Sequence, residues 1–525
     1  MYERYGDAVV RRHQVPYRDF ALEYPPAAVP VFAAPSLGAQ PGDLARYSLW
    51  FELEMLACGA AASALTGFLL VRQAAGPARL VAGTLLAGLA PLALGPVVLS
   101  RFDLWPAALT VAALAAFVAE RRRLGFALLG VAVAAKVYPA VLFPLAVPYV
   151  WRRHGRREGM ASALVGIGVA IACFLPFVVA APHGIWSSVS GQARRPLQIE
   201  SLGAATLLAA HQVWGYAVSG VSSHGSDNLG GHFAARLATA ESLLVGVVLV
   251  GLWVAFARGP ATRGRFLRYA AAAICAFVAL GKVLSPQYLI WLIPLIPLVR
   301  GRRGAVAAAL FIATLVLTQL WFPSRYIDLV YGLDARASWL VFARDLLLVA
   351  LLLTLTWPRG LARVGVGVVG AVAAVGVAAV GAAFASSSSR AEATHFGLLN
   401  ETGVASSCRT PKPVPAASSG AVRYETRAYA NRTRRRACAT VLVTPAAGAR
   451  VFSVAYRGAI DRSNPRARYL GDAGICSNAA PRLPRRVRYS FAVPAGARFV
   501  VEVEPCGTIE LPSYTISVRL RPLRS

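Results

Sequence analysis

The chain has 525 residues, of which 57% are hydrophobic and 15% are charged, and its mean hydropathy is +0.55. Soluble globular proteins carry about 25% charged residues, so this composition excludes a disordered chain, a fibrous protein and an ordinary cytosolic enzyme. It predicts a polytopic α-helical membrane protein. The formal net charge of +30 does not indicate nucleic-acid binding, because the basic clusters lie between apolar stretches, as the positive-inside rule predicts.

The first 46 residues are polar and contain no signal peptide or spanning segment. The apolar stretches that follow predict ten to twelve membrane helices, each of which needs roughly 20 residues. They lie at about 47–73, 79–99, 104–120, 124–150, 160–181, 235–257, 266–299, 304–322, 338–357 and 364–385, with a partial span at 202–222. Two of them, 124–150 and 266–299, are long and interrupted by Pro, so each is expected to form two short helices that meet at an outer bend.

Arginine clusters set the expected topology, because short cytoplasmic loops carry the excess of positive charge. They place the basic turns near residues 72–79, 121–123, 152–157, 258–268, 300–303 and 359–363 in the cytoplasm. Residues 1–46, 182–234 and 323–337 then lie outside, together with the C-terminal region.

The C-terminal region changes period from helical to alternating. Residues 386–420 are rich in Ser, Pro and Ala and are typical of a linker, whereas residues 421–525 contain six or more short alternating segments and predict an extracytoplasmic β-sandwich. Its four cysteines suggest two disulfides. Three pairings are possible, and sequence proximity favours Cys408–Cys438 and Cys476–Cys506. The remaining cysteines lie in apolar helices and are expected to be inert.

The first outer segment contains three carboxylates, Asp7, Asp19 and Glu23, among Tyr and Pro residues. A carboxylate on a loop at the membrane surface can act as a general base. The alternative is a set of solvated loop charges that pair with Arg12 and Arg18.

Charged residues near helix ends form a second group of candidates. Arg101 and Asp103 stand at the outer start of an apolar stretch, where an interfacial pair is the alternative. Lys136, followed by Tyr138, lies within an apolar stretch, where a charge costs about 2.5–3.5 kcal/mol. Lys282, followed by Gln287, repeats this arrangement, and only three lysines occur in the chain. An ammonium at such a depth suits a phosphate partner, although snorkelling to the interface is the alternative.

The outer loop around residues 194–201 combines cations with an amide and a carboxylate. Arg195, Gln198 and Glu200 form a suitable set for binding sugar hydroxyls or a phosphate, and ordinary loop polarity is the alternative. The sequence contains no HExxH motif, no CxxC pair and no P-loop, so no metal site or cofactor is expected.

In order along the chain, GDAV, VPYRDF, LEYPP, RFD, KVYP, RPLQIESL and GKVLSPQYLIWLIPL resemble the motifs of bacterial glycosyltransferase family 87. The resemblance covers about residues 1–360 and leaves out the β-sandwich. It implies a fold of the GT-C superfamily and an actinobacterial, plasma-membrane hexosyltransferase similar to mannosyltransferases. Such an enzyme would transfer mannose from a polyprenyl-phosphate donor to a glycolipid or polysaccharide acceptor outside the cytoplasm, with inversion.

The resemblance also implies roles for the candidate residues. An Asp of the first outer loop would act as the base, and here Asp19, Glu23 or Asp7 would supply it. Arg101, Lys136 and Lys282 would bind the donor phosphate. Asp103, Tyr138, Arg195, Gln198, Glu200 and Gln287 would bind sugar or acceptor.

A transporter or a flippase for a lipid-linked sugar is the alternative function. Its motivation is the intramembrane charge of Lys136, Glu241, Lys282, Arg344 and Asp345. No internal repeat extends beyond the similarity of the two broken stretches, which weakens this hypothesis.

The start of the chain raises one further expectation. In the resembling family, a transmembrane helix and the Asp that acts as the general base precede the segment that here begins at Tyr2. The hypothesis is an N-terminally truncated chain that lacks this Asp. If the chain is complete, the base must be Asp7, Asp19 or Glu23, and the Pro16–Tyr17 turn favours Asp19.

Overall fold

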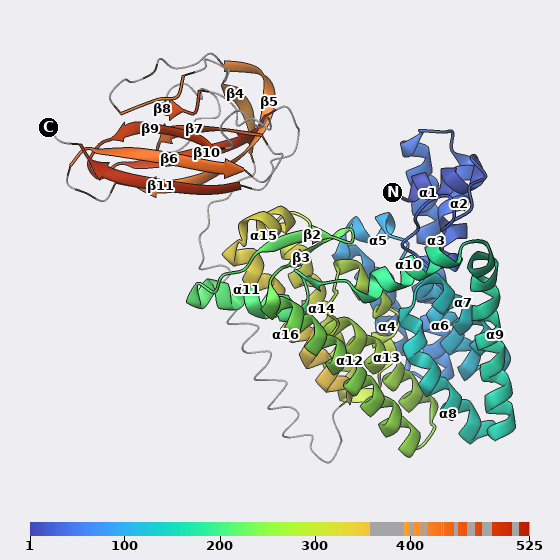
Figure 1. Ribbon diagram of the computed structural model, residues 1–525. Coiled ribbons are helices and arrows are strands. Elements are labelled where there is room, and N and C mark those ends of the chain that lie inside the picture. Colours follow the sequence, from blue (N-terminus) through green and yellow to red (C-terminus); the bar gives the residue numbers. More distant parts are fainter. Residues whose placement is uncertain are drawn as a thin grey trace. The chain divides into compact units, whose positions relative to one another are not determined.

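The computed structural model describes residues 1–356, 393–398, 404–408, 412, 417–431, 433, 435–445, 450–458, 468–474, 486–506 and 514–523. The chain divides into two compact units, Met1–Ser387 and Ser388–Ser525, which we describe separately (Figure 1). The apolar stretch predicted at 364–385 lies outside the described residues.

The first unit is helical. Its α-helices are α1 (Tyr2–Val10), α2 (Val29–Gly38), α3 (Leu44–Arg72), α4 (Pro77–Leu89), α5 (Val97–Ser100), α6 (Leu104–Val118), α7 (Arg122–Ala135), α8 (Phe143–His154), α9 (Arg156–Ala180), α10 (Pro182–Ala193), α11 (Leu202–Trp214), α12 (His232–Arg258), α13 (Arg263–Ala279), α14 (Gly301–Trp321), α15 (Tyr326–Gly332) and α16 (Ala335–Thr356). Short 3₁₀ turns are η1 (Pro26–Ala28), η2 (Ala90–Leu94), η3 (Tyr138–Leu142), η4 (Pro286–Trp291) and η5 (Ile296–Leu298). Three small strands, β1 (Leu197–Gln198), β2 (Gly220–Ser223) and β3 (Ser226–Leu229), form one antiparallel sheet in the order β1-β3-β2.

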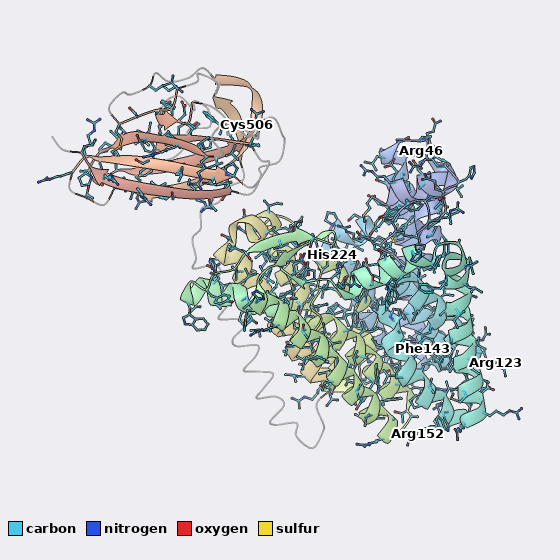
Figure 2. The ribbon with its side chains drawn as sticks, viewed as in Figure 1. Arg46, Arg123, Phe143, Arg152, His224 and Cys506 are labelled. Carbon is cyan, nitrogen blue, oxygen red and sulfur yellow. A yellow bond between two sulfur atoms is a disulfide. The ribbon has the colours of Figure 1, made fainter. Side chains whose placement is uncertain are left out.

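Within the described residues, six helical segments are long and apolar enough to cross a membrane. They are Leu44–Arg72, Pro77–Leu94, Arg156–Ala180, His232–Arg258, Gly301–Trp321 and Ala335–Thr356. Shorter apolar helices at Pro26–Gly38, Leu104–Val118 and Pro286–Leu298 accompany them. The polytopic membrane fold is therefore confirmed, with fewer full-length spans than the ten to twelve expected. Arg152 lies at one end of the helical unit and Arg46 at the other (Figure 2).

The two stretches expected to bend do so in different ways. Residues 122–154 form two helices, α7 and α8, which are separated by an extended Lys136 and the 3₁₀ turn η3. Residues 263–299 begin with α13 and continue through an extended bend into the 3₁₀ turns η4 and η5. The second α-helix expected there does not form, because Pro294 and Pro297 lack the N–H groups that an α-helix needs.

The second unit is a two-layer β-sandwich. Its strands are β4 (Ala393–Leu398), β5 (Ala417–Ala430), β6 (Ala437–Pro445), β7 (Val451–Arg457), β8 (Tyr469–Asp472), β9 (Val487–Val493), β10 (Arg498–Pro505) and β11 (Tyr514–Pro522). One sheet has the order β4-β5-β10-β7-β8 and the other β11-β6-β9, and all pairs are antiparallel. Side chains of both sheets form one apolar core, so the six predicted alternating segments are confirmed as strands.

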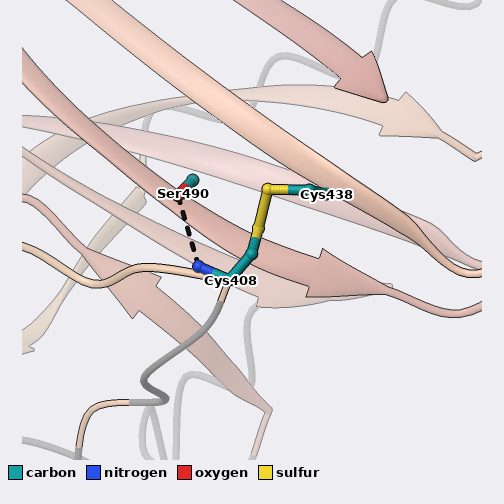
Figure 3. The surroundings of a disulfide bond; sticks show 3 residues. All are labelled: Cys408, Cys438 and Ser490. Carbon is teal, nitrogen blue, oxygen red and sulfur yellow. Dashed lines mark hydrogen bonds between the residues drawn. A yellow bond between two sulfur atoms is a disulfide. The ribbon is translucent and has the colours of Figure 1, made fainter. Parts of the chain in front are cut away.

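A disulfide joins Cys408 and Cys438, and the backbone N–H of Cys408 donates to the Ser490 hydroxyl at 3.3 Å (Figure 3). Cys506 is also disulfide-bonded, and Cys476 lies outside the described residues. Cys58, Cys173 and Cys275 are free.

Candidate functional site

A buried ion pair lies at the centre of the candidate site. Lys136 Nζ donates to Asp103 Oδ1 at 2.5 Å, and the indole N–H of Trp291 donates to the same oxygen at 2.7 Å. Asp103 is fully buried, whereas the Lys136 side chain keeps 14% of its surface exposed. Asp103 Oδ2 is buried without a hydrogen-bond partner. The pair is therefore closed on the carboxylate side and partly open on the ammonium side.

Three aromatic rings surround the Lys136 ammonium. Its Nζ lies 4.9 Å from the ring centre of Phe102, 5.0 Å from that of Trp291 and 5.3 Å from that of Tyr288. Aromatic faces attract a cation and exclude water around it. The cage thus attracts the Lys136 ammonium and limits its hydration, and a weakly hydrated cation attracts an anion more strongly than one in bulk water does.

Local backbone structure brings these groups together. Asp103 stands at the N-cap of α6, and the extended Lys136 ends α7. In the 3₁₀ turn η4 the side chains at i and i+3 eclipse one another, so Tyr288 and Trp291 stack with their ring centres 4.3 Å apart. Tyr138 stacks on the other face of this arrangement, 3.9 Å from Trp291, and its hydroxyl contacts Thr110 Oγ1 at 3.1 Å. Tyr138 was predicted to bind sugar or acceptor. Its side chain is only 1% exposed and instead packs against Trp291.

Arg101 connects this centre to the first outer segment. Its guanidinium interacts electrostatically with Asp103 and with the phenols of Tyr2 and Tyr24. Tyr24 packs edge-on against Phe102 with ring centres 4.9 Å apart, and Tyr2 stacks on Phe32 at 4.6 Å. These aromatic contacts hold the first segment beside Asp103.

Glu23 and Arg195 each approach the turn between β2 and β3, at adjacent residues. The Glu23 carboxylate lies beside Gly225, where an added Cβ would be 3.5 Å from Oε1. Arg195 Nη2 donates to the carbonyl of His224 at 2.7 Å. His224 is labelled on this hairpin in Figure 2. Arg195 is also near enough to Tyr288 and Lys136 to act on both electrostatically. The turn therefore links the predicted base segment to the cations around Lys136.

The other two carboxylates of the first segment have local partners. Asp7 pairs with Arg11 at 3.0 Å within one helical turn. Asp19 is exposed, pairs with Arg18 at 2.9 Å and accepts the backbone N–H of Val15 at 2.7 Å. These hydrogen bonds, first that from Arg18, lower the pKa of Asp19 to about 2. A carboxylate with so low a pKa is a weak base at neutral pH.

Several predicted ligands instead hold backbone in place. Lys282 Nζ donates to the Ala193 carbonyl at 2.8 Å, so it ties the end of α10 to the bend after α13. Gln198 is 4% exposed, and its Oε1 accepts the backbone N–H of Leu284 at 2.9 Å. Glu200 is 2% exposed, and burial raises its pKa to about 8. Gln287 is partly exposed next to Tyr288. Burial therefore leaves Gln198 and Glu200 little surface for a ligand.

Sequence reasoning predicted no role for Phe102, Tyr288 or Trp291. Their signal was the position of an aromatic residue next to a charge or a Pro at each bend, together with the three-residue spacing of Tyr288 and Trp291. Among the described residues, no group of three or more His, Cys, Asp or Glu side chains is arranged to hold a metal ion.

Two solved structures are similar to the chain: ArnT from Cupriavidus metallidurans bound to undecaprenyl phosphate, and the arabinosyltransferase EmbB from Mycobacterium smegmatis. The ArnT match has 16% identity, a TM-score of 0.38 and 72% coverage of each chain. The EmbB match has 12% identity and a TM-score of 0.30, and it covers 99% of this chain and 62% of EmbB. Among curated proteins, none matches the chain significantly.

A family model gives the more specific result. The model of glycosyltransferase family 87 matches residues 22–286, which is just over half of the chain. The matched segment contains Glu23, Asp103, Lys136, Arg195 and the bend at Lys282, so it includes most of the residues gathered around the Lys136–Asp103 pair. The chain is thus a membrane glycosyltransferase that belongs to glycosyltransferase family 87.

Proposed function

We propose that this protein transfers a hexose, in the first instance mannose, from a polyprenyl-phosphate donor to a glycolipid or polysaccharide acceptor of the cell envelope. The observation that carries the proposal is that the His224–Gly225 turn has Arg195 bound to one residue and the Glu23 carboxylate beside the next. A carboxylate and a cation at one turn, next to a caged lysine, supply a base and a phosphate site for glycosyl transfer.

The phosphate site of this proposal consists of three cations. Arg101 and Arg195 both act electrostatically on Lys136, and Lys136 keeps part of its ammonium exposed. Three positive charges around the buried Asp103 carboxylate leave a local positive excess. A phosphate that gains negative charge as it leaves the sugar is stabilised by such an excess. Lys282, bound to the Ala193 carbonyl, supports this site from the bend and does not contact the phosphate.

The reaction then follows as a single displacement. The acceptor hydroxyl gives its proton to Glu23, and its oxygen attacks the anomeric carbon. The bond between that carbon and the phosphate oxygen breaks, and its electron pair stays on the phosphate. Attack and departure on opposite faces invert the anomeric configuration.

We propose Glu23 rather than Asp19 as the base. Asp19 is engaged by Arg18 and by the backbone of Val15, whereas the Glu23 side chain is exposed beside Gly225. A base must reach the proton that it abstracts, and only the second arrangement leaves a carboxylate oriented toward the turn where Arg195 binds.

We further propose that the site and the β-sandwich both face the extracytoplasmic side of the plasma membrane. The positive-inside rule places the Arg152 end of the helical unit in the cytoplasm. The candidate site is built from segments that the same rule places outside, including residues 1–46 and 182–234.

The test is a transfer assay with the full chain in proteoliposomes, radiolabelled polyprenyl-phosphate mannose and membrane lipid acceptors. We expect transfer by the unaltered protein and a fall in kcat of about 10²–10³-fold for Glu23→Gln, with little change in the KM of the donor. No transfer to any membrane acceptor would refute the function. An unchanged kcat in Glu23→Gln would refute only the choice of base.

A further inference from the structure

A second buried ion pair lies away from the Lys136 cage. Arg344 and Asp345 are neighbours on α16, and Arg344 Nε lies 2.7 Å from Asp345 Oδ1, with both side chains fully buried. Charges at such positions in a membrane protein are costly. The proposed reaction does not use this pair. We therefore ask which part of the chain Arg344 binds.

Arg344 holds a distant backbone segment. Its Nη2 donates to the carbonyl of Glu200 at 2.8 Å, across 144 residues of sequence. A charged donor to a buried carbonyl forms a hydrogen bond roughly twice as strong as a neutral one. The bond therefore fixes the end of segment 197–200 against α16.

Segment 197–200 is also fixed along its length. The N–H of Gln198 donates to the Lys282 carbonyl at 2.9 Å, and the N–H of Ile199 donates to the Asp227 carbonyl at 3.0 Å. Leu197 and Gln198 pair with β3 as strand β1. The segment thus bridges α16, the bend after α13 and the β2–β3 hairpin.

Arg195 is attached directly to this bridge. Only Pro196 separates it from β1, and the fixed φ of proline leaves little freedom between the two. Arg195 Nε is buried without a hydrogen-bond partner, although Nη2 binds the carbonyl of His224. A displacement of the bridge would therefore move the Arg195 guanidinium relative to Lys136.

We propose that Arg344 is a positioning residue for the phosphate site. Through the Glu200 carbonyl it holds segment 197–200 so that the Arg195 guanidinium stays near Lys136 and can act on the same phosphate. This inference rests on the proposed function, because it assigns a phosphate to the cations around Lys136.

The test uses the full-length protein in detergent and farnesyl phosphate as a soluble polyprenyl phosphate. The double variant Arg344→Met/Asp345→Leu removes both members of the ion pair. We choose it over a single change because replacing a whole buried ion pair by apolar residues of similar size often preserves stability. We expect the Kd for farnesyl phosphate to rise roughly tenfold in this double variant, since one strong hydrogen bond that orders the site is lost. Arg195→Met alone should weaken binding by at least as much.

Combining the changes separates positioning from general destabilisation. If Arg344 acts through Arg195, adding Arg344→Met/Asp345→Leu to Arg195→Met should change the Kd by less than about twofold, because residues that act on one interaction are not additive. Leu340→Ala, on the same helix and fully buried, is the control for lost stability; it should lower Tm and leave the Kd unaltered.

The outcomes are distinct. Additive effects, an unchanged Kd in the double variant, or an equal rise in Kd for Leu340→Ala would overturn the positioning role while leaving the phosphate site in place. Failure of the unaltered protein to bind farnesyl phosphate would overturn the phosphate site itself, and the positioning role with it.

Discussion

The two units of this protein each contain a buried lysine–aspartate pair, and the pairs differ in what surrounds them. Lys136–Asp103 in the helical unit and Lys412–Asp472 in the sandwich have N–O distances of 2.5 and 2.6 Å. Their lysine side chains are 14% and 10% exposed, and both aspartates are fully buried. Distance and burial therefore do not distinguish a functional pair from a structural one.

Hydrogen-bond saturation does distinguish them. Asp472 Oδ1 accepts from Lys412 and from the N–H of Gly474, and Oδ2 accepts a short hydrogen bond from the Tyr469 hydroxyl. Asp103 accepts both of its hydrogen bonds on Oδ1 and leaves Oδ2 unpartnered. Buried polar groups are normally satisfied, and an exception requires an explanation. The Arg101 guanidinium, which interacts electrostatically with Asp103, offsets the charge on this unpartnered oxygen.

The largest expected effect is the loss of the Lys136 ammonium. Lys136→Met should reduce kcat/KM for transfer by about 10²–10³-fold, the usual cost of removing one group that stabilises developing negative charge. Lys412→Met is the matched control, since it removes an ion pair of similar length and burial. Transfer assays on both variants, normalised to folded protein, test this. A comparable loss in Lys412→Met would erase the distinction between the two pairs.

The aspartates should separate the pairs less sharply. Asp103→Asn keeps a side chain of the same shape, so Lys136 and Trp291 retain an acceptor while the attraction between the charges is lost. We expect the KM of the donor to rise by about tenfold, because the Lys136 ammonium is then no longer held in place by an ion pair. Asp472→Asn should destabilise the sandwich by on the order of 3 kcal/mol, as breaking a buried pair does, with the KM unchanged. Donor titrations measure the KM and denaturation curves measure the stability. A KM that rises in Asp472→Asn and not in Asp103→Asn would contradict the roles given to the two pairs.

Glu200 is a buried carboxyl group to which we assign no catalytic role, and its Oε2 has no hydrogen-bond partner. Its pKa of about 8 lies above its ordinary value of 4.5, because burial disfavours the charged form. The folded chain therefore holds a proton that the unfolded chain releases, and stability should fall as pH rises from about 4.5 to 8. Glu200→Gln should flatten this part of the pH–Tm profile and raise Tm at pH 8. The same slope in both proteins would show that Glu200 is not the titrating group.

The smallest effect is expected at an exposed pair. Asp19 and Arg18 form a surface ion pair, which contributes little. Asp19→Asn should change kcat by less than about threefold. A fall of 10² or more, with donor KM unaltered, would return the role of base from Glu23 to Asp19.

Much of the fold was predictable because it depends on local pattern. Apolar length predicted the spanning helices, Pro predicted the break at Lys136, and alternation predicted the strands of the sandwich. The conversion of residues 286–298 into 3₁₀ turns was missed, because apolar length alone does not distinguish helix types.

The site was less predictable because its contacts join distant segments. Lys136 and Lys282 stand in similar local sequences, yet one binds Asp103 and the other the Ala193 carbonyl. Gln198 and Glu200 were expected to face a ligand, but the β2–β3 hairpin and α16 cover their segment. Such choices depend on tertiary packing, which sequence spacing does not encode.

The most direct test of the central claim is a cryo-EM structure of the full chain with a polyprenyl phosphate bound. The account predicts a phosphate within roughly 4 Å of Lys136 Nζ, with Arg101 and Arg195 on its other oxygens. A phosphate ordered elsewhere, with Lys136 still bound only to Asp103, would contradict it.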